Sequence, residues 1–188
     1  ITRRRTPTVL QHEATECGAA CLAMVLAHHG RWVSLEEIRH AAGVSRDGTK
    51  ASNILRAGAL YGLIGQGASF QSTDLDSVRL PAIVFWNFDH FVVLEGRRGN
   101  RVFINDPALG PRTVTADEFD QAFTGIVLSF EPGPEFRPGG RPPSAMAGIH
   151  ERLQRFHSPV AAIVLAGFLL LVPGLVIPGL QAAFTDFY

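Results

Sequence analysis

The first third of the chain carries apolar residues at helical spacing, interrupted by polar residues and glycines. This pattern predicts three helices, over residues 15–29, 34–42 and 50–61. Gly30 would end the first helix, because glycine favours the position that follows a helix C-terminus. Ser34 and Glu37 form a capping box, in which each side chain satisfies a free backbone N–H group, and this marks the start of the second helix.

From about residue 80 the pattern changes to short β-branched and aromatic runs with turn residues between them. Three consecutive runs predict strands over residues 80–86, 90–96 and 101–106. A second capping box at Thr115–Glu118 predicts a short helix that ends near Ala122. A last strand is expected over residues 125–130. Helices followed by an antiparallel sheet indicate an α+β fold for residues 1–130.

The end of the chain follows a different pattern. Residues 131–143 are rich in proline and glycine and are expected to form a linker. Residues 144–157 place apolar side chains on one helical face, which suits an amphipathic helix at a membrane surface or one packed on protein. Residues 158–188 predict a transmembrane helix, because no acidic or basic residue occurs between Arg155 and Asp186, and a span needs about 20 apolar residues. A buried helical hairpin is the alternative.

Composition narrows the class of protein. The chain has 188 residues, of which 46% are hydrophobic, and this is enough for one domain with a core. Lysine plus arginine and aspartate plus glutamate number 17 each, so the charge gives no case for binding nucleic acid. Two cysteines are too few for a disulfide framework and favour a reducing compartment or a free functional thiol. The first ten residues lack the apolar segment of a secretory signal.

Cys17 lies where the first predicted helix begins, with Thr15 as the expected N-cap. The free N–H groups and partial positive charge of a helix N-terminus favour the thiolate, the nucleophilic form of cysteine. The alternative is a small residue of the core. Cys21 lies one turn further along the helix and is expected to pack in the core. A zinc site with His28 or His29 and a disulfide between the two cysteines are both disfavoured, because there is no CxxC spacing and a disulfide within one helix would be strained.

A cysteine nucleophile needs a base and a group that orients the base. His90 opens an apolar strand directly after a turn and is the candidate base, although it could also be a strand-end histidine without a role. Asp106 ends the next strand. A hairpin that turns at about residues 97–100 would set His90 near Pro107, within about one residue of Asp106, and a turn or bulge must settle the register. Asp89 should point to the other face of its strand and ranks lower.

Gln11 is the fourth candidate. Attack of a thiolate on a carbonyl creates an oxyanion that needs hydrogen-bond donors. The Gln11 side chain lies six residues before Cys17 and could reach back over the helix start, with the Cys17 backbone N–H as a second donor. A glutamine in a loop carries no signal on its own.

Taken together, these residues resemble a known family. Gln11, Cys17-Gly18 followed by AACLAMVL, and the later segments HFVVL and NDP are similar to the papain-like cysteine peptidase domain of peptidase-containing ABC transporters. Such proteins export bacteriocins and related peptides and remove a leader after a double-glycine motif. The stretches RRRTPTVLQ, HHGRWVSLEEI and GVSRDGTKASNILRA resemble the branch that serves nitrile-hydratase-leader-type microcins. The resemblance covers residues 3–130.

The resemblance implies a role for each candidate. Cys17 would be the nucleophile, His90 the base and then the acid, Asp106 the group that orients the imidazole, and Gln11 part of the oxyanion hole. Glu16 replaces an aspartate that many relatives carry, which is not expected to affect the chemistry. Non-catalytic docking of leader peptides and a different cysteine acyl-transferase activity are the alternatives.

The resemblance also implies partners and a location. The partners would be a precursor peptide with a double-glycine leader and the rest of a homodimeric ABC transporter. Residues 144–188 would enter the bacterial inner membrane, and the arginines before the span place the peptidase domain on the cytoplasmic side. No Walker A pattern occurs, so no cofactor is expected in this chain, and ATP with Mg²⁺ would bind only a nucleotide-binding domain outside it. Gly139-Gly140 superficially matches a cleavage site, but a flexible linker is expected there.

Overall fold

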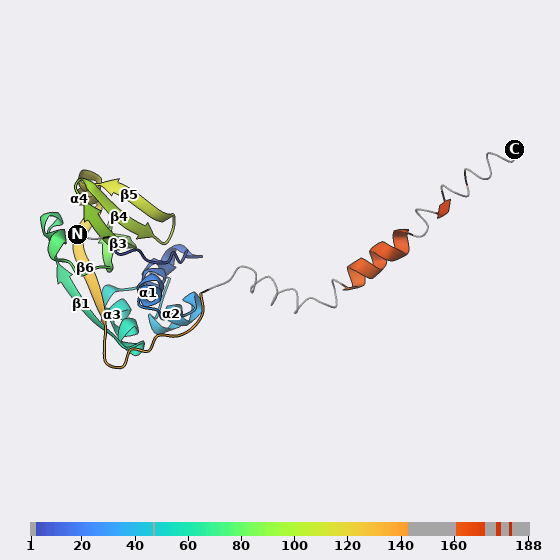
Figure 1. The fold of residues 1–188 in the computed structure, drawn as a ribbon, viewed down its shortest axis with the longest axis horizontal. Helices are drawn as coiled ribbons and strands as arrows, with labels where there is room; N and C mark the ends of the chain where they lie inside the picture. The colour runs from blue at the N-terminus through green and yellow to red at the C-terminus, as the bar shows by residue number, and fades with distance from the viewer. Residues whose placement is uncertain (1–2, 47, 143–160, 172–175, 178–180, 182–188) are drawn as a thin grey trace. The chain divides into compact units, whose positions relative to one another are not determined.

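The computed structural model describes residues 3–46, 48–142, 161–171, 176–177 and 181. The chain divides into two compact units, Ile1–Pro142 and Pro143–Tyr188. The first unit holds all the strands described below and the candidate site. Figure 1 shows it as a sheet with helices packed against it.

Six antiparallel strands form one sheet in the order β1-β6-β2-β3-β4-β5. Their bounds are β1 (Leu63–Ser69), β2 (Ala82–Trp86), β3 (His90–Arg98), β4 (Arg101–Asp106), β5 (Gly110–Thr115) and β6 (Phe123–Pro132). The α+β fold with an antiparallel sheet is therefore confirmed. The sequence did not predict β1 and β5, which are the two edge strands. Both carry glycine, and β5 also carries Pro111, which suits an edge strand because proline cannot donate a hydrogen bond to a neighbouring strand.

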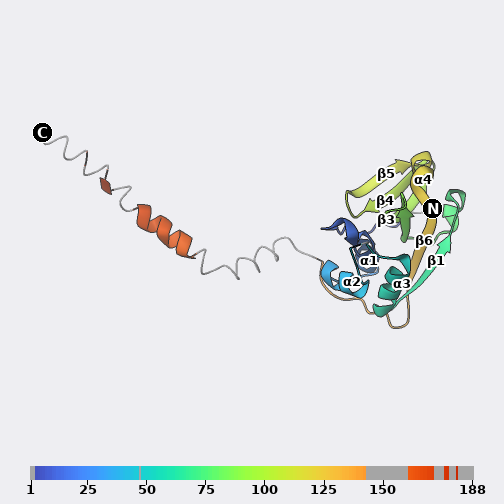
Figure 2. The same cartoon turned by 180° about the vertical axis from the view of Figure 1, so that it is seen from behind.

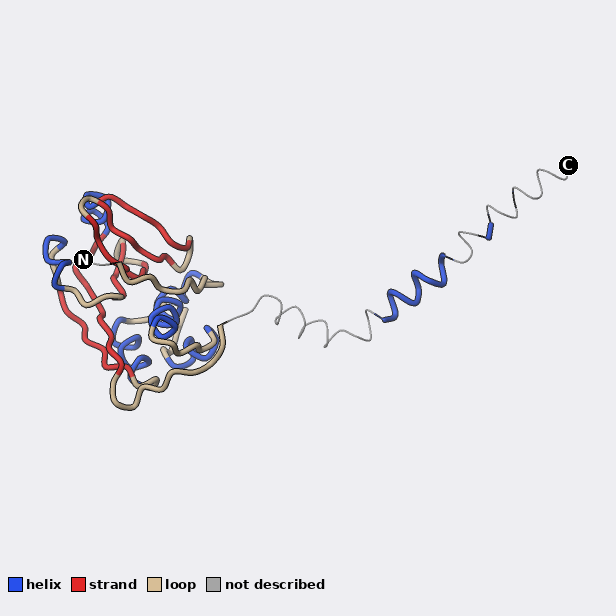
Figure 3. The backbone as a smooth tube through the Cα atoms, viewed as in Figure 1, coloured by secondary structure: helices blue, strands red, loops and turns tan. Residues whose placement is uncertain are grey.

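The helices follow the predicted order with small changes in length. Their bounds are η1 (Ala14–Glu16), α1 (Cys17–His28), α2 (Leu35–Ala41), α3 (Ala51–Leu60), η2 (Ser72–Ser77) and α4 (Ala116–Ala122). Both predicted capping boxes mark helix starts, but only the one at Thr115–Glu118 has both of its hydrogen bonds. The Ser34 hydroxyl accepts a hydrogen bond from the Glu37 N–H group, and Thr115 and Glu118 bond each other reciprocally. Figure 3 shows α1, α2 and α3 grouped together, and in Figures 1 and 2 α4 lies at the β4–β5 end.

Two hydrophobic clusters occupy the two faces of the sheet. On one face α1 is buried from Cys17 to Ala27 and packs with α2 and α3 against strand residues such as Phe91 and Val93. Small residues permit this close packing: a Cβ on Gly18 would lie 2.7 Å from the Ile54 side chain. The other face is covered by η2 and α4. The start of α1 is thereby fixed against the start of β3.

The Pro/Gly-rich stretch after β6 belongs to the same packed unit. The domain was predicted to end at residue 130, yet β6 runs to Pro132 and the Phe136 side chain is buried in the core. Gly139 continues the contact, because its carbonyl accepts a hydrogen bond from Trp32 and its N–H donates to Gly30. This part of the expected linker is therefore ordered by hydrogen bonds. We refer to residues 133–142 as the strap.

The second unit tests the membrane prediction only in part. Residues 161–171 form a helix whose side chains are exposed. Within the residues that the structure describes, none of the helices has the length and apolarity that crossing a bilayer requires. The expected interfacial helix over 144–157 and most of the expected span over 158–188 lie outside the described residues.

Candidate active site

A short 3₁₀ turn delivers the chain into α1 and sets Cys17 at its first position. Thr15 is not the N-cap as predicted, since it lies inside η1 and Glu16 occupies the cap position. The Glu16 carboxylate is buried and accepts hydrogen bonds from the backbone N–H groups of His12 at 2.8 Å and Glu13 at 3.1 Å, and from Arg39 at 3.0 Å. Burial raises the pKa of Glu16, but these N–H groups and the Arg39 charge outweigh it and lower the pKa. Glu16 therefore holds the turn in place as a carboxylate.

His90 begins β3 directly after a tight turn from β2. Asn87 and Phe88 both have positive φ, and the Asn87 N–H donates to the Ala122 carbonyl at 2.8 Å, which anchors the turn. The His90 Nε2 atom lies 3.0 Å from Asp106 Oδ1. Asp106 thus engages Nε2, and Cys17 is the other side chain whose interaction with the ring raises the pKa of His90. One imidazole thus joins the thiol to the carboxylate.

The surroundings of His90 favour its charged form. Burial lowers the pKa of the ring, but the hydrogen bonds to Asp106 and Cys17 and the charges of both groups outweigh burial and raise the pKa to about 9. At neutral pH the ring therefore holds a proton that it can share with the sulfur on one side or deliver to a leaving group.

Asp106 is held by more groups than the sequence indicated. Its Oδ1 atom accepts from His90 and from the Ala108 backbone N–H at 2.8 Å, and its Oδ2 atom accepts from Arg112 at 3.3 Å. Burial raises the pKa of Asp106, but these donors and the His90 charge lower it overall. Arg112 was missed because it lies on β5, the edge strand that the sequence did not reveal.

The register between β3 and β4 differs by one residue from the prediction. Val93 pairs with Asn105, whereas the predicted register would pair Val92 with Asn105. Next to the turn, where Arg98 pairs with Arg101, the strands lie two residues from the predicted register. A bulge between Leu94 and Gly96, where Glu95 has no partner opposite it in β4, reduces the difference to one. Such a bulge is the device that the sequence alone could not place.

Backbone hydrogen bonds tie Gln11 to the residue after Asp106, and tie its neighbour His12 to the residue before Cys17. Its backbone N–H donates to the Pro107 carbonyl at 2.9 Å, directly after Asp106. The next residue, His12, donates to Glu16, directly before Cys17. The Gln11 Oε1 atom is buried and has no hydrogen-bond partner in the described part of the chain, so the protein does not fully engage this amide.

Cys21 and Asp89, the two candidates that ranked lower, lie in other surroundings. Cys21 is 0% exposed, and its thiol donates to the Phe91 carbonyl at 3.3 Å. Burial, followed by the charges of Cys17 and Asp106, raises the pKa of Cys21, so its predicted packing role is confirmed. Asp89 is exposed at the turn before His90.

A cleft of about 540 Å³ opens at Cys17. One wall comes from the residues before α1 and from the loop before α3, and the other comes from the β2–β3 turn and β6. Its lining residues are Ala14, Thr15, Cys17, Arg46, Gly48, Thr49, Lys50, Ala51, Phe85, Phe88, Asp89, Phe91 and Ile126. The mainly apolar cleft could hold an extended peptide against the sulfur.

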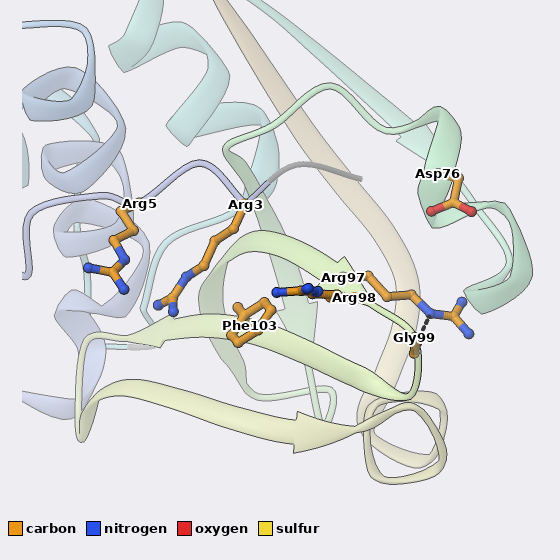
Figure 4. Close-up of a pocket in the computed structure, with 7 residues that line it drawn as sticks. All are labelled: Arg3, Arg5, Asp76, Arg97, Arg98, Gly99 and Phe103. Carbon is orange, nitrogen blue, oxygen red and sulfur yellow. Dashed lines mark hydrogen bonds between the residues drawn. The ribbon is translucent and has the colours of Figure 1, made fainter.

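A larger concavity of about 1020 Å³ lies elsewhere, between the start of the chain and the β3–β4 turn (Figure 4). It is lined by Arg3, Arg5, Asp76, Arg97, Arg98, Gly99 and Phe103. Its lining includes one carboxylate, Asp76, but no cysteine, histidine or serine, so it lacks the thiol and imidazole that meet at the smaller cleft. The chemistry belongs to the smaller cleft, in spite of the difference in size.

The fold and the site define a class before any relative is considered. A helix-start cysteine, a histidine and an aspartate on antiparallel strands, and a glutamine whose backbone is bonded directly after that aspartate are the groups that thiol-based acyl transfer requires. The chain belongs to the Peptidase C39 family, whose sequence model matches residues 5–135. This family comprises cysteine peptidases.

Known relatives agree with this family. A probable microcin-H47 secretion/processing ATP-binding protein from Escherichia coli is 37% identical over 134 residues, which are 71% of this chain and 19% of that protein. The chain thus spans about a fifth of the length of such relatives. The crystal structure of a double glycine motif protease from an AMS/PCAT transporter, in complex with the leader peptide, is 49% identical, with a TM-score of 0.68 over 69% of this chain and 94% of that one. The peptidase domain of Streptococcus ComA, a bi-functional ABC transporter, is 25% identical, with a TM-score of 0.64 over 69% of this chain and 98% of that one.

Proposed function

We propose that the chain is a cysteine endopeptidase that removes the leader of a bacteriocin- or microcin-type precursor after a Gly-Gly motif. The observation that carries this proposal is the His90 imidazole, which is hydrogen-bonded to Asp106 and has its pKa raised by both Asp106 and Cys17. The related double glycine motif protease, crystallised with a leader peptide, supports the substrate class.

Acylation follows from the positions of the groups. The thiol proton rests on His90, and the Cys17 sulfur attacks the carbonyl carbon of the second glycine. The negative charge that forms on the carbonyl oxygen is stabilised by the Gln11 side-chain amide and the Cys17 backbone N–H. His90 then gives its proton to the leaving nitrogen, the C–N bond breaks, and the leader remains on the sulfur as a thioester.

Deacylation returns the enzyme to its starting state. A water molecule gives a proton to His90 and attacks the thioester carbonyl. The C–S bond breaks, the leader leaves with a new carboxylate, and the sulfur regains its proton from His90. Asp106 stays ionised throughout and keeps Nε2 of the ring occupied, so that Nδ1 faces the sulfur and substrate.

The site also gives a physical reason for glycine at the cut. The carbonyl must come within bonding distance of a sulfur that lies in a residue only 4% exposed. A side chain on either of the two residues that precede the cut would meet the walls of the cleft. Two glycines permit a close backbone approach that bulkier residues do not.

We further propose that this domain works as part of a longer ABC exporter. Residues 144–188 would enter the bacterial inner membrane, with the peptidase domain on the cytoplasmic side. The exporter would be a homodimer, and ATP with Mg²⁺ would bind a separate nucleotide-binding domain. The secretion/processing relatives, of which this chain spans about a fifth, support this arrangement.

A peptide assay tests the activity. A precursor peptide whose leader ends in Gly-Gly is incubated with the wild type and with Cys17→Ala, and the products are identified by mass spectrometry. Cleavage after the second glycine by the wild type alone is expected. Equal cleavage by Cys17→Ala would overturn the proposal, and binding of the peptide without cleavage would indicate a docking module. A peptide with Val in place of the second Gly should resist cleavage, and its rapid hydrolysis would indicate a less selective acyl-transferase.

A further inference from the structure

A buried polar cluster beside the site takes no part in the chemistry described above. Glu95 in β3 is 1% exposed, Asn105 in β4 is 0% exposed, and Thr6 near the start of the chain is 8% exposed. A buried polar side chain is costly unless it is hydrogen-bonded. The partners of these groups therefore indicate which part of the fold they stabilise.

The side chains of Glu95 and Asn105 form hydrogen bonds to the extended stretch at the start of the chain. Glu95 Oε1 accepts from the Thr6 backbone N–H at 2.8 Å and from its hydroxyl at 3.0 Å, and Oε2 accepts from Arg3 at 2.8 and 2.6 Å. Asn105 donates to the Thr6 carbonyl at 3.2 Å and to its hydroxyl at 3.0 Å, and accepts from the Thr8 hydroxyl at 3.3 Å. The Thr6 hydroxyl thus links the two strands.

Arg3 closes the outer end of this cluster. Its guanidinium lies over the Phe103 ring, 4.4 Å from the centroid, on the floor of the arginine-lined concavity shown in Figure 4. The Arg4 backbone N–H donates to the Glu95 carbonyl at 2.7 Å. The bulge in β3 therefore holds the start of the chain through both its backbone and its side chain.

The same stretch leads directly to Gln11. It is attached to β4 at Asn105 and again at Pro107, on either side of Asp106. A side chain that must meet an oxyanion contributes most when it is held in place before the reaction. The cluster fixes the backbone that carries Gln11 relative to the strand that carries Asp106.

We propose that Glu95 and Asn105 are positioning residues, which act through the stretch at Thr6 and Thr8 to hold the Gln11 amide at the oxyanion. This inference rests on the proposed peptidase function and adds to it. Neither residue is among those that line the cleft at Cys17. Their contribution falls on the step in which the oxyanion forms.

A matched pair of variants at Thr6 tests the inference. Thr6→Val keeps the shape and removes the hydroxyl that bridges Glu95 and Asn105, whereas Thr6→Ser keeps the hydroxyl. We expect Thr6→Val to lower kcat about tenfold with an unchanged KM, and Thr6→Ser to stay within about twofold of the wild type. For comparison, Gln11→Ala should cost about 100-fold, since loss of an oxyanion donor costs on that order.

A double-mutant cycle shows whether the effect passes through Gln11. In the Gln11→Ala background, Thr6→Val should change kcat by less than about twofold, because residues that act as one unit are not additive. A further full tenfold loss would overturn the inference. Thr8→Val removes only the bond to Asn105 and serves as a milder variant, with an expected loss of about threefold, should Thr6→Val fail to fold.

The number of competent sites is measured separately by alkylating Cys17 with iodoacetamide. Alkylation needs the thiol and not the oxyanion hole, so its rate should be the same in all of these variants, and kcat is given per alkylated site. Equal kcat per site in Thr6→Val and Thr6→Ser, even with a lower melting temperature for Thr6→Val, would overturn the positioning role alone. A wild type that alkylates normally but cleaves no Gly-Gly peptide would instead overturn the proposed function.

Discussion

His90 Nε2 lies 3.0 Å from Asp106 Oδ1, although the two residues are not directly opposite each other in the sheet. The observed register, continued by one residue beyond the Val93–Asn105 pair, sets Val92 opposite Asp106. His90 therefore reaches Asp106 along the diagonal, and residues two apart in a strand share a face of the sheet. Because the diagonal contact engages Nε2, Nδ1 is the ring nitrogen left for the thiol.

Asp106→Asn should leave the fold intact and lower kcat by at least about 100-fold, since an amide can favour the wrong ring tautomer. It should also move the alkaline limb of the pH–rate profile below pH 9, because the carboxylate is one of the groups that raise the pKa of His90 to about 9. Circular dichroism and pH–rate profiles check both outcomes. Asp89→Asn is the matched control and should keep nearly full activity; the reverse pattern would identify Asp89 as the group that orients the ring.

His90 should also make stability depend on pH. Its folded-state pKa of about 9 lies above the ordinary value of 6.5, so its contribution is fully present below pH 6.5 and is lost as pH rises through about 9. Asp106 has a lowered pKa, so its contribution is present above its ordinary value of 3.8 and is lost as pH falls through the lowered pKa. Urea unfolding of wild type and His90→Gln at pH 6, 7.5 and 9 checks this. The difference in free energy of unfolding should shrink with pH, and a constant difference would contradict it.

The two cysteines should differ in reactivity. Cys17 lines the cleft, whereas Cys21 is fully buried. The Cys21 thiol is hydrogen-bonded to the Phe91 carbonyl, and burial raises its pKa. Iodoacetamide should therefore modify Cys17 well before Cys21, as shown by peptide mapping at successive times. Cys21→Ala should keep its alkylation at Cys17, and equal rates at the two thiols of the wild type would argue against activation of Cys17.

Residue type and spacing were sufficient to predict the central part of the fold. Strands β2, β3, β4 and β6 are apolar runs because both faces of the sheet are covered, and the two capping boxes mark helices by local hydrogen bonding. The edge strands were missed because they carry polar residues, glycine and proline without a clear alternation. Arg112 was missed with β5.

Local rules were also insufficient at the start of α1. Thr15 has the side chain of an N-cap, but the 3₁₀ turn formed by Ala14–Glu16 moves the cap to Glu16, which long-range contact with Arg39 helps to hold. Glu95 carried a signal that could have been used: a glutamate inside the apolar run HFVVLEG is a candidate for a buried, paired charge. Its partners lie about 90 positions away, which no local pattern reveals.

Phe88 should contribute to substrate binding at a cost in stability. It is 79% exposed, lines the cleft and has a φ of 62°, which is unfavourable for a bulky side chain. Phe88→Asn should keep or raise the free energy of unfolding, by up to about 1 kcal/mol, because asparagine tolerates this conformation. It should raise KM several-fold, since apolar contact in the cleft is lost. Leu60→Gln, an exposed apolar residue outside the cleft, is the control and should leave KM unchanged.

Gly140 should be required for the strap to dock. Its φ is 77°, and a Cβ there would collide with the Trp32 carbonyl oxygen, whereas the neighbouring Gly139 bonds Trp32 and Gly30. Gly140→Ala should therefore lower the free energy of unfolding by about 2 kcal/mol or more. Gly99→Ala is the matched control, because Gly99 also has a positive φ of 59° but a Cβ there would meet nothing within 4 Å.

Both variants share the backbone strain of a positive φ. The difference between their losses in free energy of unfolding therefore measures the collision alone. Gly99→Ala should lose only about 1 kcal/mol, and equal losses in urea unfolding would mean that the strap does not need the close approach.

The docked strap also explains why Gly139-Gly140 should not be a substrate. Both residues are held against the loop after α1, so the extended backbone that Cys17 attacks is not presented. The wild type should therefore keep its intact mass on prolonged incubation, and cleavage after Gly140 would show that the strap releases readily.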